Sequence, residues 1–291
     1  MMLIDNFSAS LISVLECPLS HAPLRVEGND LVASSTIIWK GGDFRCSPTF
    51  SSFPIWRKGQ DSYEKYFSSY LTALTEEELH SVDEETLEIY DQIKLSGRVL
   101  DVGGGFGMAG VQARVDPDNY ISIDPIVCLW RQLDASSAFA RHYQTAASFV
   151  RIPGVAEKLP FVNRSFDTVH MRSCIDHFAD PQTALLEARR VLKGSGKLVI
   201  GTSLEHAIKL TGNAFRDGVK KLVKCSLIGD IYERLFDHHM FHPTEKSMKG
   251  LLLKSGFRIN KLIWQQGYFN VIYIEAAPAQ FSPSPSSLPA F

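Results

Sequence analysis

The feature that most constrains this chain is a short apolar run that leads into four glycines. Residues 99–107 read VLDVGGGFG, with glycines at positions 103, 104, 105 and 107. A short apolar run that ends in turn residues is typical of a buried strand. Glycines let the backbone turn sharply and approach a ligand closely, and N–H groups at the start of a following helix can face an anionic group. The pattern predicts a buried strand, a ligand-binding loop and a short helix at Met108–Arg114.

An acidic residue follows the next predicted strand. Asp124 closes the apolar run Tyr120–Ile123. In an open α/β sheet, a carboxylate at this place lies beside the glycine loop and can accept hydrogen bonds from the two hydroxyls of a ribose. A strand, a glycine loop, a helix and an acid in this order predict a ligand that contains a nucleoside.

Two classes of nucleoside ligand fit the glycines. Residues 105–110 (GFGMAG) also match G-x-G-x-x-G, the loop that binds the pyrophosphate of a nicotinamide dinucleotide. Asp101 favours a different class, because a carboxylate two residues before the first glycine attracts an amino-acid ammonium and repels a pyrophosphate.

Strand and helix patterns alternate from Gly97 to about Ala277. The predicted strands are Arg98–Val102, Tyr120–Ile123, Phe149–Ile152, Phe166–Met171, Lys197–Gly201, Phe257–Trp264 and Phe269–Glu275, and the longer helices are 75–94, 126–143, 181–192 and 244–255. This alternation predicts an α/β fold, in which a doubly wound, mostly parallel sheet of seven strands carries helices on both faces. The turn signal at Gln265–Gly267 joins the last two strands as a hairpin and adds a terminal antiparallel strand.

The chain divides into unequal parts. Residues 1–57 contain short strand patterns broken by Gly, Pro and Ser, which predict a small β-rich module. Residues 58–94 form a helical lead-in, and residues 95–277 form the main domain with an insert at 202–241. Residues 278–291 are rich in Pro, Ser and Ala and are predicted to be disordered.

Bulk composition bounds the partners. The 291 residues carry a net charge of −2 and are 45% hydrophobic, which is ordinary for a soluble globular protein. The net charge is too small and of the wrong sign to attract nucleic acid or an anionic membrane, although a local basic patch is compatible with these numbers. Five cysteines without a secretion signal predict free thiols, and no apolar run approaches the ~20 residues of a membrane span. We therefore expect a cytoplasmic protein with no membrane partner.

Three ordered motifs resemble a known family. The run VLDVGGGFG resembles motif I of class I S-adenosylmethionine-dependent methyltransferases. Residues 154–161 (GVAEKLPF), 165–169 (SFDTV) and 184–199 (ALLEARRVLKGSGKLV) resemble the signature of the type 11 branch. The resemblance covers about residues 95–275. It implies a Rossmann-like fold, S-adenosyl-L-methionine as cofactor and methyl transfer as the activity.

The resemblance also implies which residues bind the cofactor: Asp101, Gly103, Gly104, Gly105, Gly107, Asp124, Pro125, Ala156, Glu157, Arg172 and Ser173. Asp101 would orient the ammonium, directly or through water, and Asp124 would bind the ribose. The glycines would line the methionine part, while Pro125 and Glu157 would flank the adenine from opposite sides. Arg172 and Ser173 would face the transferring methyl. Val155 departs from the family, which usually has an aspartate there.

Methyl transfer from a sulfonium mainly needs alignment and exclusion of water, but a hydroxyl or carbon nucleophile also needs a base. His177 is the candidate for that base or for a substrate contact; the alternative is a local capping role. The run Asp237-His238-His239-Met240-Phe241-His242 invites a metal interpretation. Adjacent histidines on an extended segment point to opposite sides, so we expect no metal.

The N-terminal module has a resemblance of its own. Residues 17–20 (CPLS) and 46–49 (CSPT) resemble the Trm112-like zinc ribbon, but Ser20 and Thr49 stand at two of its four ligand positions. Two cysteines cannot close a tetrahedral zinc site. We predict a degenerate, metal-free ribbon with a core of Leu15, Leu24, Val32, Phe44, Phe53 and Ile55; the alternative is an unrelated β module.

The insert carries the strongest hint about the acceptor. Ile208, Phe215, Val219 and Leu222 recur at helical spacing, and five basic residues lie among them: Lys209, Arg216, Lys220, Lys221 and Lys224. This pattern suggests a small-molecule acceptor with an anionic group, or else only a solvated basic face on a packing helix. Tyr63, Tyr66 and Phe67 are candidates either for acceptor contact or for core packing.

Three functions remain open at this point. The leading interpretation is a methyltransferase acting on a small molecule. The first alternative is an rRNA or tRNA base methyltransferase, which the near-neutral charge and the lost zinc ligands disfavour. The second is a non-catalytic, methyltransferase-like binding protein. The oligomeric state is not predicted.

Overall fold

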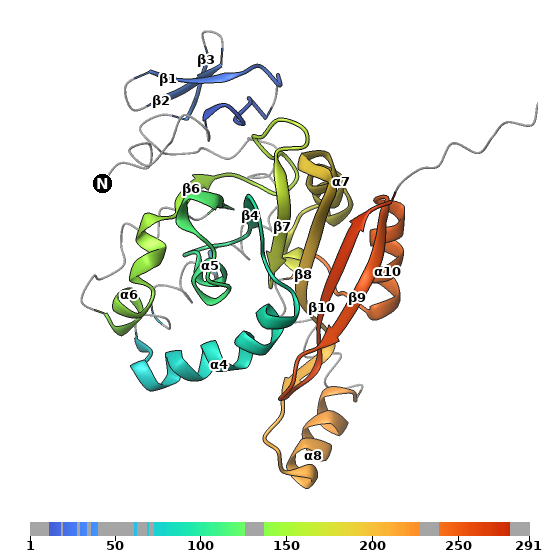
Figure 1. Cartoon of the computed structure of the whole chain (residues 1–291). Coiled ribbons are helices and arrows are strands. Elements are labelled where there is room, and N and C mark those ends of the chain that lie inside the picture. Colours follow the sequence, from blue (N-terminus) through green and yellow to red (C-terminus); the bar gives the residue numbers. More distant parts are fainter. Residues whose placement is uncertain are drawn as a thin grey trace, which may run out of the picture.

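A twisted seven-stranded sheet forms the centre of the computed structural model, which describes residues 12–18, 20–27, 30–33, 36–39, 61–62, 69, 73–125, 137–226 and 239–279 (Figure 1). Its strands are β4 (Val99–Val102), β5 (Tyr120–Asp124), β6 (Val150–Pro153), β7 (Phe166–Arg172), β8 (Leu192–Lys209), β9 (Phe257–Trp264) and β10 (Tyr268–Pro278). The order across the sheet is β6-β5-β4-β7-β8-β10-β9. Strands β4 to β8 pair in parallel, and β10 is antiparallel to both its neighbours. The predicted α/β fold with a terminal antiparallel strand is confirmed.

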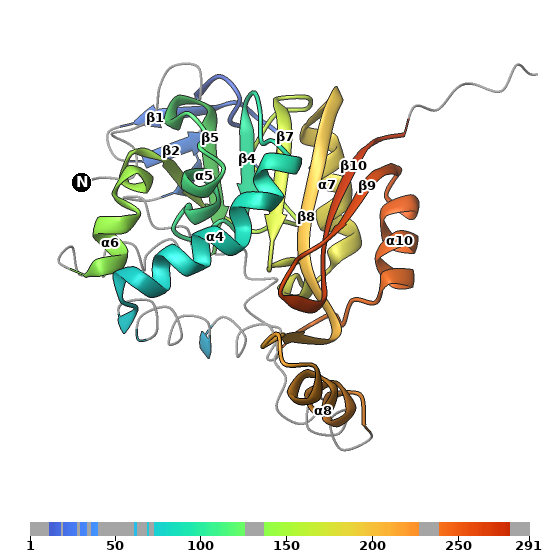
Figure 2. The same ribbon diagram turned by 60° about the horizontal axis from the view of Figure 1, so that its bottom comes forward.

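Helices cover both faces of this sheet (Figures 1 and 2). They are α4 (Glu76–Gln92), α5 (Met108–Gln112), α6 (Ala138–His142), α7 (Pro181–Val191) and α10 (Glu245–Lys254). A further helix, α8 (Ala214–Lys224), projects beyond the end of β8. Side chains along β4 point alternately into two cores, one on each face of the sheet. Val99 belongs to the core under α4, α5 and α6, whereas Leu100 belongs to the core under α7 and α10. No helix within the described ranges is long and apolar enough to cross a membrane.

Capping residues fix the starts of the two helices whose boundaries the sequence marks most clearly. The Thr75 side chain accepts from the backbone N–H of Glu78, and the Glu78 carboxylate accepts from the N–H of Thr75. Thr244 caps α10 in the same reciprocal way with Ser247. Both predicted helices therefore begin where expected. Of the helix predicted at 126–143, the structure describes only the part from residue 137, which holds α6.

Strand β8 is much longer than predicted. The expected strand was Lys197–Gly201, but β8 extends from Leu192 to Lys209. The reason is the hairpin of β9 and β10, since Tyr268 pairs with Lys209 and Ile272 with Thr202. Ile208 therefore lies on a strand, so the prediction that placed it on a helix with Phe215 is wrong.

The N-terminal residues form a second, three-stranded antiparallel sheet of β1 (Leu24–Glu27), β2 (Asp30–Ala33) and β3 (Thr36–Trp39). It is attached to the main domain, because Leu15 forms a β-bridge with Phe161 and Glu16 lies 2.9 Å from the Arg190 guanidinium. Leu15, Leu24 and Val32 are buried as predicted.

Several predictions fall outside the described residues. These are the ribbon positions Cys46, Thr49, Phe44, Phe53 and Ile55, the aromatic residues Tyr63, Tyr66 and Phe67, and the tail from residue 280. The two residues 278–279, expected in that tail, instead continue from β10, where the Ala279 N–H donates to the Gly256 carbonyl. The degenerate zinc ribbon stays a prediction.

A half-buried carboxylate links the helices of one face. Asp83 of α4 accepts from the Tyr143 hydroxyl at 2.6 Å and from the Gln112 amide at 2.7 Å, and His142 Nε2 lies 2.7 Å from it. Gln112 in turn accepts from the Arg172 guanidinium at 2.6 Å. Burial raises the pKa of Asp83, but these hydrogen bonds outweigh it and hold the pKa below its usual value. Asp83 is therefore ionised at neutral pH and links three helices to the end of β7.

We predict that Asp83→Ala lowers the free energy of unfolding by roughly 2–3 kcal/mol at neutral pH, because it leaves buried donors unsatisfied. The control is Asp91→Ala, an exposed position on the same helix. Since the folded pKa is lowered, the contribution of Asp83 is complete above the unfolded pKa near 4 and is lost as the pH falls through the folded value. Denaturant unfolding at pH 7 and pH 3 measures both effects. Equal losses for both variants at pH 7 contradict the prediction.

Candidate functional site

The loops that follow four parallel strands meet at one edge of the sheet. The Gly103 N–H donates to the Ile123 carbonyl at 2.8 Å, which joins the loop after β4 to the end of β5. The Gly154 N–H donates to the Asp124 carbonyl at 3.2 Å, and the Cys174 thiol donates to the Val102 carbonyl at 3.2 Å. These bonds bring together the predicted residues Gly103, Gly104, Gly105, Gly107, Asp124, Pro125, Ala156, Glu157, Ser173 and His177.

The glycine loop has no room for side chains at two positions. A Cβ on Gly103 would lie 2.6 Å from the Cβ of Cys174, and Gly103 has a φ of 69°. A Cβ on Gly104 would lie 2.5 Å from both the Asp101 carboxylate and the Ser122 hydroxyl. The loop therefore runs against side chains of the loop after β7, of the neighbouring strand β5 and of its own strand β4, which requires glycine.

Asp101 lies beneath this loop and is 1% exposed. One carboxylate oxygen accepts from the Tyr120 hydroxyl, and the other lies 2.8 Å from His170 Nδ1. Burial and the adjacent Asp101 carboxylate raise the pKa of Tyr120, which keeps its hydroxyl protonated as a donor. Tyr90 continues this series of contacts, because its hydroxyl lies 3.3 Å from His170 Nε2. This arrangement favours the indirect role that the sequence allowed for Asp101, in which it acts through the loop or a water.

Asp124 lies at the end of β5 beside the glycine loop. Its Oδ2 accepts from the Gly105 N–H at 3.0 Å, and Gly105 has a φ of 48°. The carboxylate therefore fixes the loop and borders the edge at which a ribose is expected.

The loop after β6 supplies the opposite wall. Ala156 and Glu157 are buried, and Glu157 accepts from the Asp180 N–H at 3.1 Å. Burial raises the pKa of Glu157, although hydrogen bonds from backbone N–H groups partly offset the rise. Val155 packs against Ala179 and Met240. An aspartate at position 155 would be desolvated by Met240, which would destabilise its charged form. This cost gives a physical reason for the departure from the family pattern.

Three side chains from two distant segments meet beside this edge. His177 ends the short 3-10 turn Ile175–His177, and its ring centroid lies 4.5 Å from that of His239. His239 Nε2 is 3.5 Å from Asp176 Oδ2, and His177 Nε2 is 3.9 Å from Asp176 Oδ1. The Met240 and Phe241 N–H groups hold the two segments together, because both donate to the Asp176 carbonyl.

These three residues are also of the types that bind metal, and their nearest donor atoms lie within 4.8 Å of one another. Two donors on one tetrahedral zinc ion would lie about 3.3 Å apart, given Zn–N distances of 2.0–2.1 Å. Both measured separations from Asp176 exceed that value. Both separations are also longer than ordinary hydrogen bonds. The absence of a metal stays a prediction.

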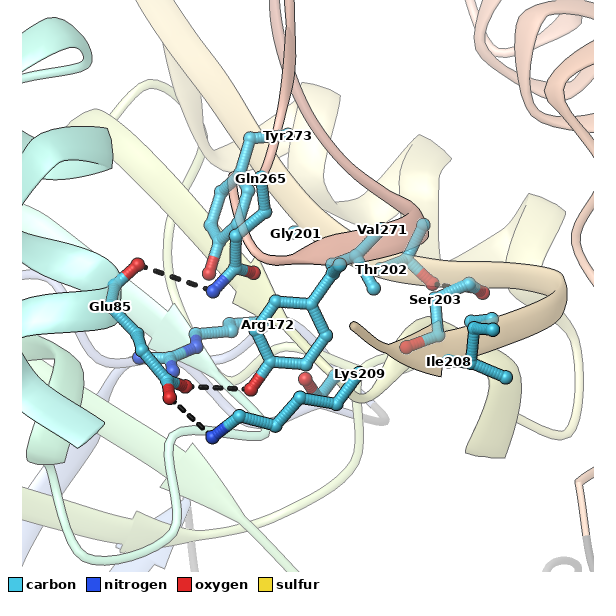
Figure 3. A pocket seen from close by; sticks show the side chains of 13 residues that line it. Glu85, Arg172, Gly201, Thr202, Ser203, Ile208, Lys209, Gln265, Val271 and Tyr273 are labelled. Carbon is cyan, nitrogen blue, oxygen red and sulfur yellow. Dashed lines mark hydrogen bonds and ion pairs between the residues drawn. The ribbon is translucent and has the colours of Figure 1, made fainter. Parts of the chain in front are cut away.

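A cavity of about 290 Å³ opens next to Ser173, between α4 and the ends of β7, β8 and β10 (Figure 3). Arg172 lines it together with Glu85, Lys209, Gln265, Tyr268 and Tyr273. Glu85 accepts from the Tyr268 hydroxyl at 2.6 Å and forms an ion pair with Lys209. The sequence indicated Arg172 and Ser173 here, and Ile208 and Lys209 through the insert. It did not indicate Glu85, Gln265, Tyr268 or Tyr273, because α4, β8 and β10 meet only in the fold.

Comparison with known proteins shows what the strands and loops at this edge are similar to. Residues 100–200 match the family model described as a methyltransferase domain. The chain therefore contains a region similar to this family over about a third of its length. Its matched residues run from β4 to β8 and include the glycine loop, Asp124, Glu157 and His177.

Curated relatives are methyltransferases as well. A chloroplastic 2-methyl-6-phytyl-1,4-hydroquinone methyltransferase of Oryza sativa is 35% identical over 39% of this chain and 31% of its own length. A ubiquinone/menaquinone biosynthesis C-methyltransferase of Xanthomonas oryzae is 28% identical over 57% of this chain and 68% of its own length. The chain thus spans about a third of the length of the rice relative.

Two solved structures share the fold of this chain. A Pyrococcus horikoshii protein is 23% identical with a TM-score of 0.50, and covers 74% of this chain and 98% of its own. A chain in a complex between the Haloferax volcanii Trm112 methyltransferase activator and a methyltransferase is 14% identical with a TM-score of 0.51. It covers 75% of this chain and 97% of its own.

We predict that Gly104→Ala weakens binding of S-adenosylhomocysteine roughly 10–100-fold, because the added Cβ pushes the loop away from Asp101 and Ser122. The matched control is Gly250→Ala on α10, where a Cβ meets nothing within 4 Å. Titration calorimetry measures the affinity, and thermal unfolding shows whether both variants fold. An unchanged affinity in a folded Gly104→Ala protein contradicts the assignment of the loop.

Proposed function

We propose that this chain is an S-adenosylmethionine-dependent methyltransferase that acts on a small-molecule acceptor. The observation that carries the proposal is the edge where four loops join around Gly103–Gly107, with Asp124 beside them. Such an edge offers backbone N–H groups for the methionine part and a carboxylate for the ribose.

Different residues of the site would bind different parts of the cofactor during methyl transfer. The cofactor supplies a methyl group on a positively charged sulfur, and its leaving group is neutral. The protein therefore mainly orients the nucleophile and excludes water. Gly103, Gly104, Gly105 and Gly107 would shape the floor of the cofactor site, and Asp101 would hold that floor in place. Pro125, Ala156 and Glu157 would enclose the adenine.

The cavity beside Ser173 is the site we propose for the acceptor. Two cations, Arg172 and Lys209, line it against one carboxylate, Glu85. This balance favours a small acceptor with an anionic or hydroxyl group. The names of the rice and Xanthomonas relatives give quinone compounds as products or substrates, which also supports a small-molecule acceptor.

His177 is proposed as the base that takes a proton from the acceptor. Its ring packs on His239 and lies near the buried Asp176, so its orientation is restricted. A restricted imidazole beside the loop after β7 can receive a proton as the nucleophile attacks. Catalysis by this group typically contributes 10²–10⁴-fold to the rate.

We predict that Asp124→Asn weakens S-adenosylmethionine binding about 10–100-fold. The amide oxygen can still accept from the Gly105 N–H, so the loop is kept, while the charge that favours two ribose hydroxyls is lost. Calorimetry with the purified chain measures the affinity. Asp116→Asn, at the exposed start of a 3-10 turn, is the control. Failure of the wild type to bind at millimolar cofactor overturns the proposed function.

We predict that His177→Ala lowers kcat at least tenfold on a turned-over acceptor and leaves cofactor affinity unchanged, because it removes only the base. His242→Ala serves as control, since the centre of its ring lies 6.4 Å from that of His239, farther than the 4.5 Å between the rings of His177 and His239. Acceptors are screened by transfer of labelled methyl groups.

The same assay tests the role of metal. If the cluster of Asp176, His177 and His239 works without an ion, dialysis against a chelator leaves the rate unchanged. Loss of the rate on chelation and its return with zinc would show that the histidines are ligands.

A further inference from the structure

Helix α8 is amphipathic, and its apolar side faces away from the protein. Phe215, Val219, Leu222 and Val223 recur at positions that share one side of a helix. Phe215 is 81% exposed and Leu222 is 75% exposed. Among the described residues, four of the seven large hydrophobic side chains that are exposed lie on this one helix. Such a concentration marks an interaction surface.

The polar side of α8 makes the contacts with the domain. Asp217 is buried and accepts from the N–H and hydroxyl of Thr211. Lys220 donates to the Lys209 carbonyl at 3.3 Å, and the Lys221 ammonium lies 4.5 Å from the centre of the Phe269 ring. A surface helix of a globular protein normally turns its apolar side inward. The reversed orientation leaves the apolar side available to a partner.

We infer that α8 docks onto an anionic lipid surface. Arg216 borders the apolar side and is exposed. Lys220 lies farther round the helix and is also exposed, and Lys224 is half-buried at the end of the helix. A helix with aromatic and aliphatic residues on one side and lysines on the other lies in a membrane interface, and the cations attract anionic head groups. Two copies related by a twofold axis would instead bring the same cations together, which repels.

The position of α8 suits a flat partner. The helix projects from the body of the protein at the end of β8, away from the sheet and the other helices (Figures 1 and 2). It follows Ile208 and Lys209, which line the cavity beside Ser173. A docked helix would hold that cavity close to the lipid surface. The expectation of no membrane partner rested on net charge and on the absence of a spanning run, and neither reports on a helix that lies on the surface.

The test compares binding of the full chain to vesicles of phosphatidylcholine with and without phosphatidylglycerol, by co-sedimentation at low and high salt. We expect the wild type to bind the anionic vesicles and to be released by salt. The double variant Phe215→Ser/Leu222→Ser is expected to bind at least about tenfold more weakly. Leu253→Ser, an exposed apolar position on α10, is the control and is expected to bind like the wild type.

Three outcomes overturn the inference. The first is no binding of the wild type to anionic vesicles, and the second is binding that the double variant does not weaken. The third is a dimer that sedimentation velocity detects in the wild type and not in the double variant, which assigns the surface to a second copy. Vesicle binding needs no methyl transfer, so failure here leaves the proposed function standing.

Discussion

The hydrogen bonds of Asp101 are the interactions on which the rest of the site depends. A carboxylate that is 1% exposed is stable only with partners, and Tyr120 and His170 supply one for each oxygen. The same carboxylate lies directly against Gly104, so Asp101 sets the position of the glycine loop. Removing one partner would leave a buried charge uncompensated and the loop without its support.

A second network sets the helices over this centre and reaches the acceptor side. Asp83 holds α4 against Gln112 of α5, and Gln112 holds the Arg172 guanidinium at the end of β7. Arg172 therefore enters the cavity from a fixed position. The glycine loop and the cavity wall both rest on networks of polar side chains on the same face of the sheet. In the proposed function, these networks would align a methyl donor with an acceptor.

The sequence predicts the parts of this arrangement that depend on local pattern. Glycines after an apolar strand, Asp124 after the next strand and the Thr75 capping box each carry a signal within a few residues, and the structure has all three elements. The partners of Asp101 carry no such signal, because they depend on the register of β4 with β5 and β7. No local pattern indicates that His239 lies beside His177 either, because the two residues are far apart in the sequence. The helical spacing in the insert predicted α8, but not that its apolar side faces outward.

A crystal structure of the chain with S-adenosylhomocysteine tests the central claim most directly. The account predicts that the ligand lies across Gly103–Gly107, with both ribose hydroxyls on the Asp124 carboxylate and with Asp101 still bonded to Tyr120 and His170. The sulfur would then point toward the cavity beside Ser173. A ligand bound elsewhere, or an Asp101 carboxylate that leaves Tyr120 to meet the ammonium directly, would contradict it.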